Sequence, residues 1–134
     1  MTGKAEEFAA AVLITTSQGI PLVREPNRSP SFWKLPGGKG KDSETPEECA
    51  VREVKEETGL VILADNLFMV DCEDRGSHKF IVLQTSLSDL SGILAKGEEG
   101  EEVRIFSVRE IMEMKDFLPQ HCRIVEKIMK ALVN

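Results

Sequence analysis

The segment TPEECAVREVKEETG, at residues 45–59, contains both the start signal and the stop signal of a helix. Thr45 offers a hydroxyl oxygen to an unpaired backbone N–H, and Pro46 suits the first helical position because it has no N–H to lose. Glu48 completes a capping box with Thr45, and Gly59 readily adopts the left-handed conformation that ends many helices. The sequence therefore predicts a helix between Thr45 and Gly59, around which the neighbouring segments must pack.

Apolar and β-branched segments on both sides of this helix are typical of β-strands. These strand patterns occupy residues 8–15, 20–25, 60–73, 78–87 and 101–108. The turn SQG joins the first two, so we expect them to form an antiparallel pair. The Pro- and Gly-rich loop that follows is expected to contain a short strand at residues 32–35.

Two further helices are predicted near the end of the sequence. Ser107 and Glu110 form a second capping box, and Pro119 opens a final helix. The apolar residues that share one face of the final helix are Ile124, Ile128, Met129 and Leu132. Strands followed by a helix, twice over, predict an α/β fold in which helices cover both faces of a mixed sheet.

The composition limits the classes of protein that this chain can belong to. Its 134 residues suit one domain, residues 1–134, since a second core would have little chain left. The net charge of −6 argues against nucleic-acid binding, which depends on Lys and Arg neutralising phosphates. No segment is long and apolar enough to span a bilayer, so no membrane partner is expected. Three cysteines without close pairing favour free thiols and a cytoplasmic protein.

Three glutamates of the predicted helix lie close together when residues are placed about 100° apart around the helix axis. Glu53, Glu56 and Glu57 share an arc of roughly 100° beside the apolar face, where like charges at these spacings repel one another. A solvated acidic face is the simpler interpretation. A divalent cation such as Mg²⁺ would instead offset the repulsion and use the oxygens as ligands. Arg52, next to Glu56 on the wheel, is placed to restrain an acidic side chain.

The loop before the helix, LPGGKGK, contains the paired glycines Gly37 and Gly38. A glycine pair is most often a turn, but it also lets the backbone approach a ligand closely. Loop and helix together resemble the signature of the Nudix hydrolase family at every specified position. The matching residues are Gly38, Glu44, Arg52, Glu53, Val54, Glu56, Glu57, Gly59 and Leu60. More loosely, the resemblance extends over most of the chain, which is similar to the MutT-like group.

This resemblance implies an α/β/α sandwich that hydrolyses a nucleoside diphosphate linked to another group, with Mg²⁺ or Mn²⁺ as cofactor. In the family, the glutamates that match Glu53, Glu56 and Glu57 bind the metal. A backbone carbonyl at the position of Gly37 assists them. A water held by the metal attacks one phosphorus, and the diphosphate bond breaks.

The resemblance also implies supporting and catalytic roles around this metal site. Glu44 and Arg52 would hold the helix and the loop in place. The general base in relatives is either a glutamate of the signature, here Glu53, or a glutamate from a later loop. Glu98 and Glu99, with Glu102 behind them, are the loop candidates, and Glu99 is slightly preferred. One of the glutamates in this loop is expected to complete the metal shell.

Markers beyond the signature help to narrow the substrate. No proline lies between Leu60 and Leu118, and the chain has no tyrosine, so the markers of the ADP-ribose and dinucleoside polyphosphate types are absent. We therefore expect a small nucleotide substrate, a nucleoside triphosphate cleaved to monophosphate and pyrophosphate. A nucleotide sugar is the alternative substrate. A non-catalytic nucleotide sensor is the alternative of another class, although such proteins usually lose carboxylates of the signature.

Candidate substrate contacts lie on and beside the glycine-containing loop. Arg24 and Arg28 are candidates for phosphate contacts, and Gly38 for close backbone approach. Trp33 is a candidate for stacking on a base, with a place in the core as the equal alternative. The sequence leaves the oligomeric state open between monomer and homodimer.

Overall fold

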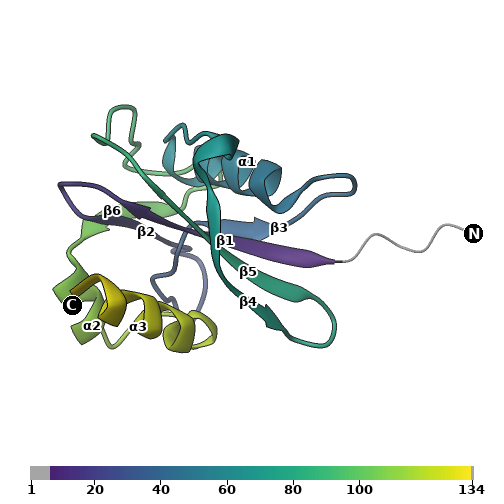
Figure 1. Ribbon diagram of the computed structural model, residues 1–134. Helices are drawn as coiled ribbons and strands as arrows, with labels where there is room; N and C mark the ends of the chain where they lie inside the picture. Colours follow the sequence, from purple (N-terminus) through teal and green to yellow (C-terminus); the bar gives the residue numbers. More distant parts are fainter. Residues whose placement is uncertain (1–6, 134) are drawn as a thin grey trace, which may run out of the picture.

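The computed structural model describes residues 7–133, except the side chains of Gln120, Cys122, Ile124, Met129, Leu132 and Val133. The strands are β1 (Phe8–Thr15), β2 (Ile20–Arg24), β3 (Gly37–Lys39), β4 (Phe68–Asp74), β5 (Lys79–Ser86) and β6 (Glu102–Phe106). The helices are α1 (Pro46–Thr58), the 3-10 helix η1 (Ala64–Asn66), α2 (Val108–Glu113) and α3 (Pro119–Val133). Along this part of the chain, strands β1 to β3 precede α1 and η1, and strands β4 to β6 precede α2 and α3 (Figure 1).

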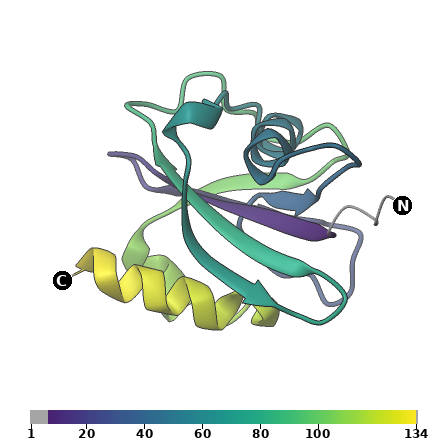
Figure 2. The ribbon, with the colours of Figure 1, turned by 45° about the vertical axis from the view of Figure 1, so that its right-hand side comes forward.

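The main sheet has the strand order β3-β1-β5-β4. β1 and β5 are parallel, while β3 and β4 run antiparallel to their neighbours, so the sheet is mixed. A second sheet consists of the antiparallel strands β2 and β6. α1 lies on one side of the main sheet, and α2 and α3 lie on the other (Figures 1 and 2). The predicted α/β/α sandwich with a mixed sheet is confirmed.

β1 contributes to the hydrophobic core on both faces of the sheet. Successive side chains of a strand point to opposite faces, and those of β1 separate in this way. Ala11 and Leu13 belong to the cluster on the side of α2 and α3. Val12 and Ile14 belong to the cluster that includes Val54 of α1. Burying side chains of this size stabilises the fold by about 1.5–3 kcal/mol each, which fixes α1 firmly against the sheet.

The predicted limits of α1 are confirmed. The backbone N–H of Glu48 donates to the hydroxyl of Thr45 at 3.1 Å, and the N–H of Thr45 donates to the Glu48 carboxylate at 2.9 Å. At the other end, Gly59 has φ of 79°, the left-handed conformation. The capping box predicted for α2 is likewise present at Ser107 and Glu110.

Three details of the predicted strands are wrong. β2 does not form a hairpin with β1, because it pairs with β6 in the second sheet, and β1 and β2 share only a bridge between Thr16 and Gly19. Residues 60–67 contain η1 and irregular backbone, and the strand begins only at Phe68. Residues 32–35 form isolated bridges rather than a strand.

The final helix begins at Pro119, as predicted. Ile128 packs against the core cluster on this side of the sheet, whereas the side chains of Ile124, Met129 and Leu132, predicted for the same face, lie outside the described residues. No helix within residues 7–133 has both the length and the apolar character needed to cross a membrane.

Candidate active site

The two glycines at the start of β3 bring its backbone against β1 and α1. Gly37 pairs with Ala11, and a Cβ on Gly37 would lie 2.0 Å from the carbonyl oxygen of Ala10. A Cβ on Gly38 would lie 2.8 Å from the carboxyl carbon of Glu53. Backbone contacts this short do not occur, so only glycine fits at position 37, whereas a side chain at position 38 would require Glu53 to move. β3 therefore lies close to the acidic face of α1.

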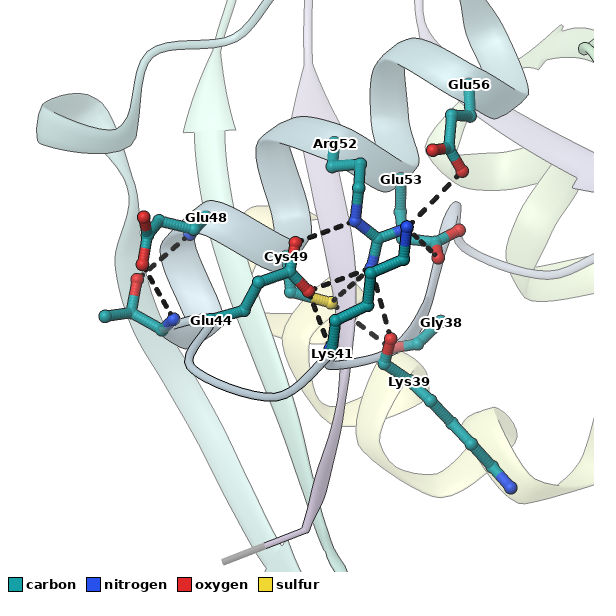
Figure 3. A network of polar contacts seen from close by, with 10 residues as sticks. Gly38, Lys39, Lys41, Glu44, Glu48, Cys49, Arg52, Glu53 and Glu56 are labelled. Atoms are coloured by element: carbon teal, nitrogen blue, oxygen red, sulfur yellow. Dashed lines mark hydrogen bonds and ion pairs between the residues drawn. The ribbon is translucent and has the colours of Figure 1, made fainter. Parts of the chain in front are cut away.

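Arg52 joins the acidic face of α1 to the preceding loop (Figure 3). Its guanidinium donates to both carboxylate oxygens of Glu44, at 2.7 Å and 2.9 Å, and to the Lys39 carbonyl oxygen at 3.3 Å. The same group donates to Glu53 at 2.8 Å and to Glu56 at 3.4 Å. Two-point hydrogen bonding to Glu44 fixes the plane of the guanidinium, which therefore holds two helix glutamates in defined positions.

Glu44 is held in its charged form by these contacts. The hydrogen bond from Arg52 lowers the pKa of Glu44 to about 2, aided by the backbone N–H of Lys41. That N–H donates to the Glu44 carboxylate at 2.7 Å. The pKa of Arg52 is raised, chiefly by its hydrogen bond to Glu44. The structure thus brings Glu44 and Arg52 together as a permanent ion pair beside the helix.

Glu57 lies in a different environment from its neighbours. Its side chain is buried, and its carboxylate accepts a hydrogen bond from the backbone N–H of Gly37 at 2.9 Å. Burial raises the pKa of Glu57 well above its usual range, and the nearby charges of Glu53 and Glu101 raise it further. Burial therefore favours the neutral form of this carboxyl group, and a cation bound next to it would favour the charged form.

A later loop is fastened to the C-terminal end of α1. The N–H of Leu94 donates to the Thr58 carbonyl oxygen at 2.8 Å, and the N–H of Glu98 donates to the Glu56 carbonyl oxygen at 2.8 Å. Helices leave their last carbonyls unpaired, so the loop satisfies groups that would otherwise need water. The contact places the loop glutamates next to those of the helix.

Helix and loop together enclose an acidic cavity of about 480 Å³. Its lining residues are Lys41, Arg52, Glu53, Glu56, Glu57, Glu98, Glu99 and Glu101. The cavity thus unites the predicted helix glutamates with the loop candidates Glu98 and Glu99. The third loop candidate, Glu102, does not line the cavity, because its carboxylate accepts hydrogen bonds from Arg24 at 3.1 Å.

The cavity includes two residues that the sequence did not single out. Glu101 is only 7% exposed, and Lys41 lies at the rim beside Arg52. Glu101 and Glu102 are adjacent glutamates, and nothing in their order tells which one faces the cavity. Strand alternation is the one usable signal: Glu102 pairs with Arg24 in the β2–β6 register, so its predecessor points the other way.

The residues predicted to contact the substrate, Arg24, Arg28 and Trp33, do not line the acidic cavity. Trp33 is 3% exposed and has Arg24 above its ring at 4.5 Å, so in this conformation the indole belongs to the core and offers no face to a base. Arg24 is itself engaged by Glu102. Arg28 is exposed and pairs with Glu25 at 2.6 Å. It lines a cavity of about 340 Å³ that also borders Glu99 and Glu101 of the acidic cavity.

The donor set of the acidic cavity fits a hard divalent cation. Carboxylates are the preferred ligands of Mg²⁺, and the buried Glu57 with its raised pKa lies among them. Within the described residues, however, no three His, Cys, Asp or Glu side chains converge into a ready-made metal site. Arg52 holds Glu53 and Glu56, so these carboxylates must turn toward an incoming ion.

Comparison with known proteins identifies the family. A sequence model of the NUDIX domain matches residues 6–128, and the chain therefore belongs to the Nudix family. It is 37% identical over 62 residues to an 8-oxo-dGTP diphosphatase of Proteus vulgaris, covering 45% of this chain and 55% of that protein. It is 29% identical over 111 residues to an ADP-ribose pyrophosphatase of Methanocaldococcus jannaschii, covering 81% and 64%. The chain thus spans less than two thirds of either relative.

Solved structures show the same fold. A MutT structure from work on Aliivibrio salmonicida and Vibrio cholerae superposes with a TM-score of 0.80 at 22% identity, covering 95% of this chain and 99% of that one. A MutT protein from Methanosarcina mazei Go1 gives a TM-score of 0.71 at 21% identity, with both chains fully covered.

Proposed function

We propose that this chain hydrolyses a diphosphate bond in a nucleoside diphosphate linked to another moiety, using Mg²⁺ or Mn²⁺. The observation that carries this proposal is the acidic cavity, in which glutamates of α1 and of the later loop face one another. A solvated acidic face would not enclose carboxylates from two segments or bury one of them. Such a cavity attracts a cation, and the bound cation in turn attracts an anionic substrate.

Each residue of the cavity has a distinct part in this proposal. Glu53, Glu56 and Glu57 hold the cation, which when bound neutralises phosphate charge and activates water. Until the cation binds, Arg52 holds the side chains of Glu53 and Glu56 near the positions in which they would bind it. Glu44 fixes Arg52 by its two-point hydrogen bond. Turning two carboxylates of one helix by side-chain rotation leaves the backbone of the site unchanged.

A carboxylate at the rim is the proposed general base. Glu98 and Glu99 lie at the tip of the loop and line the cavity, so they are available to accept a proton from water. Glu53 remains the alternative base within the helix. One of its carboxylate oxygens already accepts a hydrogen bond from Arg52 at 2.8 Å.

The substrate extends from the acidic cavity past Arg28. The acidic cavity and the neighbouring one share Glu99 and Glu101, and that neighbour shares Glu25 and Arg28 with a third cavity of about 390 Å³. Phe32 and Lys34 line this third cavity. We place the diphosphate in the first cavity and the rest of the substrate along the other two, with Arg28 available to a phosphate between them.

A nucleoside triphosphate is the proposed substrate, cleaved to a monophosphate and pyrophosphate. The similarity to an 8-oxo-dGTP diphosphatase supports this class. A nucleotide sugar is the second candidate, because the relative that covers 81% of this chain is an ADP-ribose pyrophosphatase. The absence of proline between Leu60 and Leu118 weighs against the second candidate.

Product identification separates these possibilities. Purified protein is incubated with Mg²⁺ and a panel of nucleoside triphosphates and nucleotide sugars, and the products are separated by anion-exchange chromatography. We expect a nucleoside monophosphate and pyrophosphate from at least one triphosphate. Release of a sugar phosphate would favour the second candidate. Tight nucleotide binding without any product, with either Mg²⁺ or Mn²⁺, would instead identify a non-catalytic sensor.

A further inference from the structure

The loop that faces α1 is a small hairpin with a tight tip. The N–H of Val103 donates to the Ala95 carbonyl oxygen at 3.2 Å, and the N–H of Gly100 donates to the Gly97 carbonyl oxygen at 3.0 Å. Gly100 has φ of 88°, as expected for the left-handed residue that follows a tight turn. Residues 98–99 therefore occupy the middle of the turn, where the backbone sets the direction of both side chains.

Glu101 lies inside this hairpin rather than on its surface. One of its carboxylate oxygens accepts a hydrogen bond from the backbone N–H of Glu99 at 3.1 Å. A Cβ on Gly97 would lie 2.4 Å from that oxygen and 2.6 Å from the carbonyl oxygen of Glu57, so Gly97 is packed between the carboxylate and α1. The Glu101 side chain thus holds the turn by a hydrogen bond, and the end of α1 packs against the same turn.

We propose that Glu101 is a positioning residue for the proposed reaction. Its carboxylate acts as a hydrogen-bond acceptor that fixes the turn and thereby aims Glu98 and Glu99 at the helix glutamates. Glu102, the next residue, cannot share this task because it is paired with Arg24 on the other side of the strand. The effect on catalysis rests on the proposed function, whereas the effect on the turn does not.

Two substitutions separate positioning from direct chemistry. Glu101→Gln keeps an oxygen that accepts a hydrogen bond but removes the charge, and Glu101→Ala removes both. We expect Glu101→Gln to keep kcat within about 3-fold of wild type, and Glu101→Ala to lower it about 10- to 100-fold, because a displaced catalytic group loses alignment. KM should change less than about 3-fold in both, since substrate binding is not altered.

Hydrogen exchange at the Glu99 amide tests the turn without any substrate. In ¹⁵N-labelled protein, exchange of this amide should be at least about 10-fold faster in Glu101→Ala and nearly unchanged in Glu101→Gln. Glu113→Ala, an exposed change on α2, serves as the matched control for loss of a carboxylate and should leave both kcat and exchange as in wild type.

Three results would overturn the proposal. Equal kcat in wild type and Glu101→Ala would remove any positioning role. Loss of kcat in Glu101→Gln as large as in Glu101→Ala, with wild-type exchange, would show that the charge acts directly. If the wild-type protein turns over no substrate, the proposed function fails, and unchanged exchange in Glu101→Ala would then separately reject the role in the turn.

Discussion

His121 of α3 is a buried histidine, and none of the described residues forms a hydrogen bond with its Nδ1 atom. Its ring stacks on Phe80 of β5, with ring centroids 4.8 Å apart, and Phe117 lies nearby at 6.5 Å. Burial, together with the nearby charges of Lys34 and Arg75, lowers the pKa of His121 to about 4. The imidazole therefore serves as a neutral packing group in the folded protein.

This environment predicts a loss of stability in acid. In the unfolded chain His121 takes up a proton near pH 6.5, and in the folded protein only near pH 4, so the unfolded state binds more protons between these values. Stability should fall by about 3 kcal/mol between pH 6.5 and 4, and show no contribution from His121 above pH 6.5. Glu and Asp titrations in the same range are common to all variants and cancel in a comparison.

The measurement is urea unfolding followed by the fluorescence of Trp33, the sole tryptophan. His121→Phe retains the stacking on Phe80 and cannot take up a proton, so its loss of stability in acid should be about 3 kcal/mol smaller than that of wild type. His78→Gln changes the other histidine and leaves His121 in place, so it should behave as wild type. Identical acid profiles for wild type and His121→Phe would contradict this account.

Individual site residues were predictable where a local rule determines them. Helical spacing was enough to place Glu53, Glu56 and Glu57 on one face. Helical spacing also placed Arg52 beside Glu56, but it did not show the contacts of Arg52 with Glu44 and Glu53. Nor did it show that Glu101 rather than Glu102 would enter the cavity, because that outcome depends on the pairing of β2 with β6, which are far apart in the sequence.

At the scale of elements, the end of α1 determines where the loop of residues 92–101 lies. Gly59 ends the helix in the left-handed conformation and leaves no space for a side chain. A Cβ there would lie 2.5 Å from the Leu94 side chain and 2.7 Å from the Gly92 carbonyl oxygen. The same glycine thus ends the helix and allows the loop to dock on it.

Two glycine substitutions distinguish these roles. Gly59 and Gly76 both have positive φ, at 79° and 83°, but nothing lies within 4 Å of a Cβ on Gly76. Gly76→Ala should lower the free energy of unfolding by about 1 kcal/mol from backbone strain alone. Gly59→Ala adds the steric conflict with the loop and should cost about 2–4 kcal/mol, with lower turnover. Equal losses in urea unfolding would argue against tight docking of the loop.

The strands were harder to predict than the helices. Caps mark both ends of α1 in the sequence, and both were located correctly. The partner of β2 was not located correctly: β2 pairs with β6, which lies about 80 residues further along the chain, rather than with β1. A short turn between two strand patterns suggested a hairpin, but the buried residues Leu22 and Val23 are paired with Arg104 and Val103 of β6. The pairing of strands so far apart in the sequence is decided by side-chain packing, and the sequence of the turn does not indicate it.

At the scale of the whole molecule, the positions of the charges matter more for nucleotide binding than the net charge does. The net charge of −6 would repel a nucleotide, yet much of the negative charge lines one cavity. Lys41 and Arg52 at that cavity balance only part of it. In the proposed function a divalent cation supplies the balancing positive charge, and a bound cation allows an acidic surface to bind phosphate. This is the central claim of the proposed function.

Turnover of the preferred nucleotide by wild type and Glu57→Gln, with Mg²⁺ and with chelator, tests this claim most directly. The glutamine keeps an acceptor for the Gly37 N–H but loses the charge, so the fold should remain as stable as wild type by Trp33 fluorescence. We predict turnover that disappears with chelator and falls at least about 100-fold in Glu57→Gln with Mg²⁺ present. Wild-type turnover that survives chelation, or an equally active Glu57→Gln, would contradict the account.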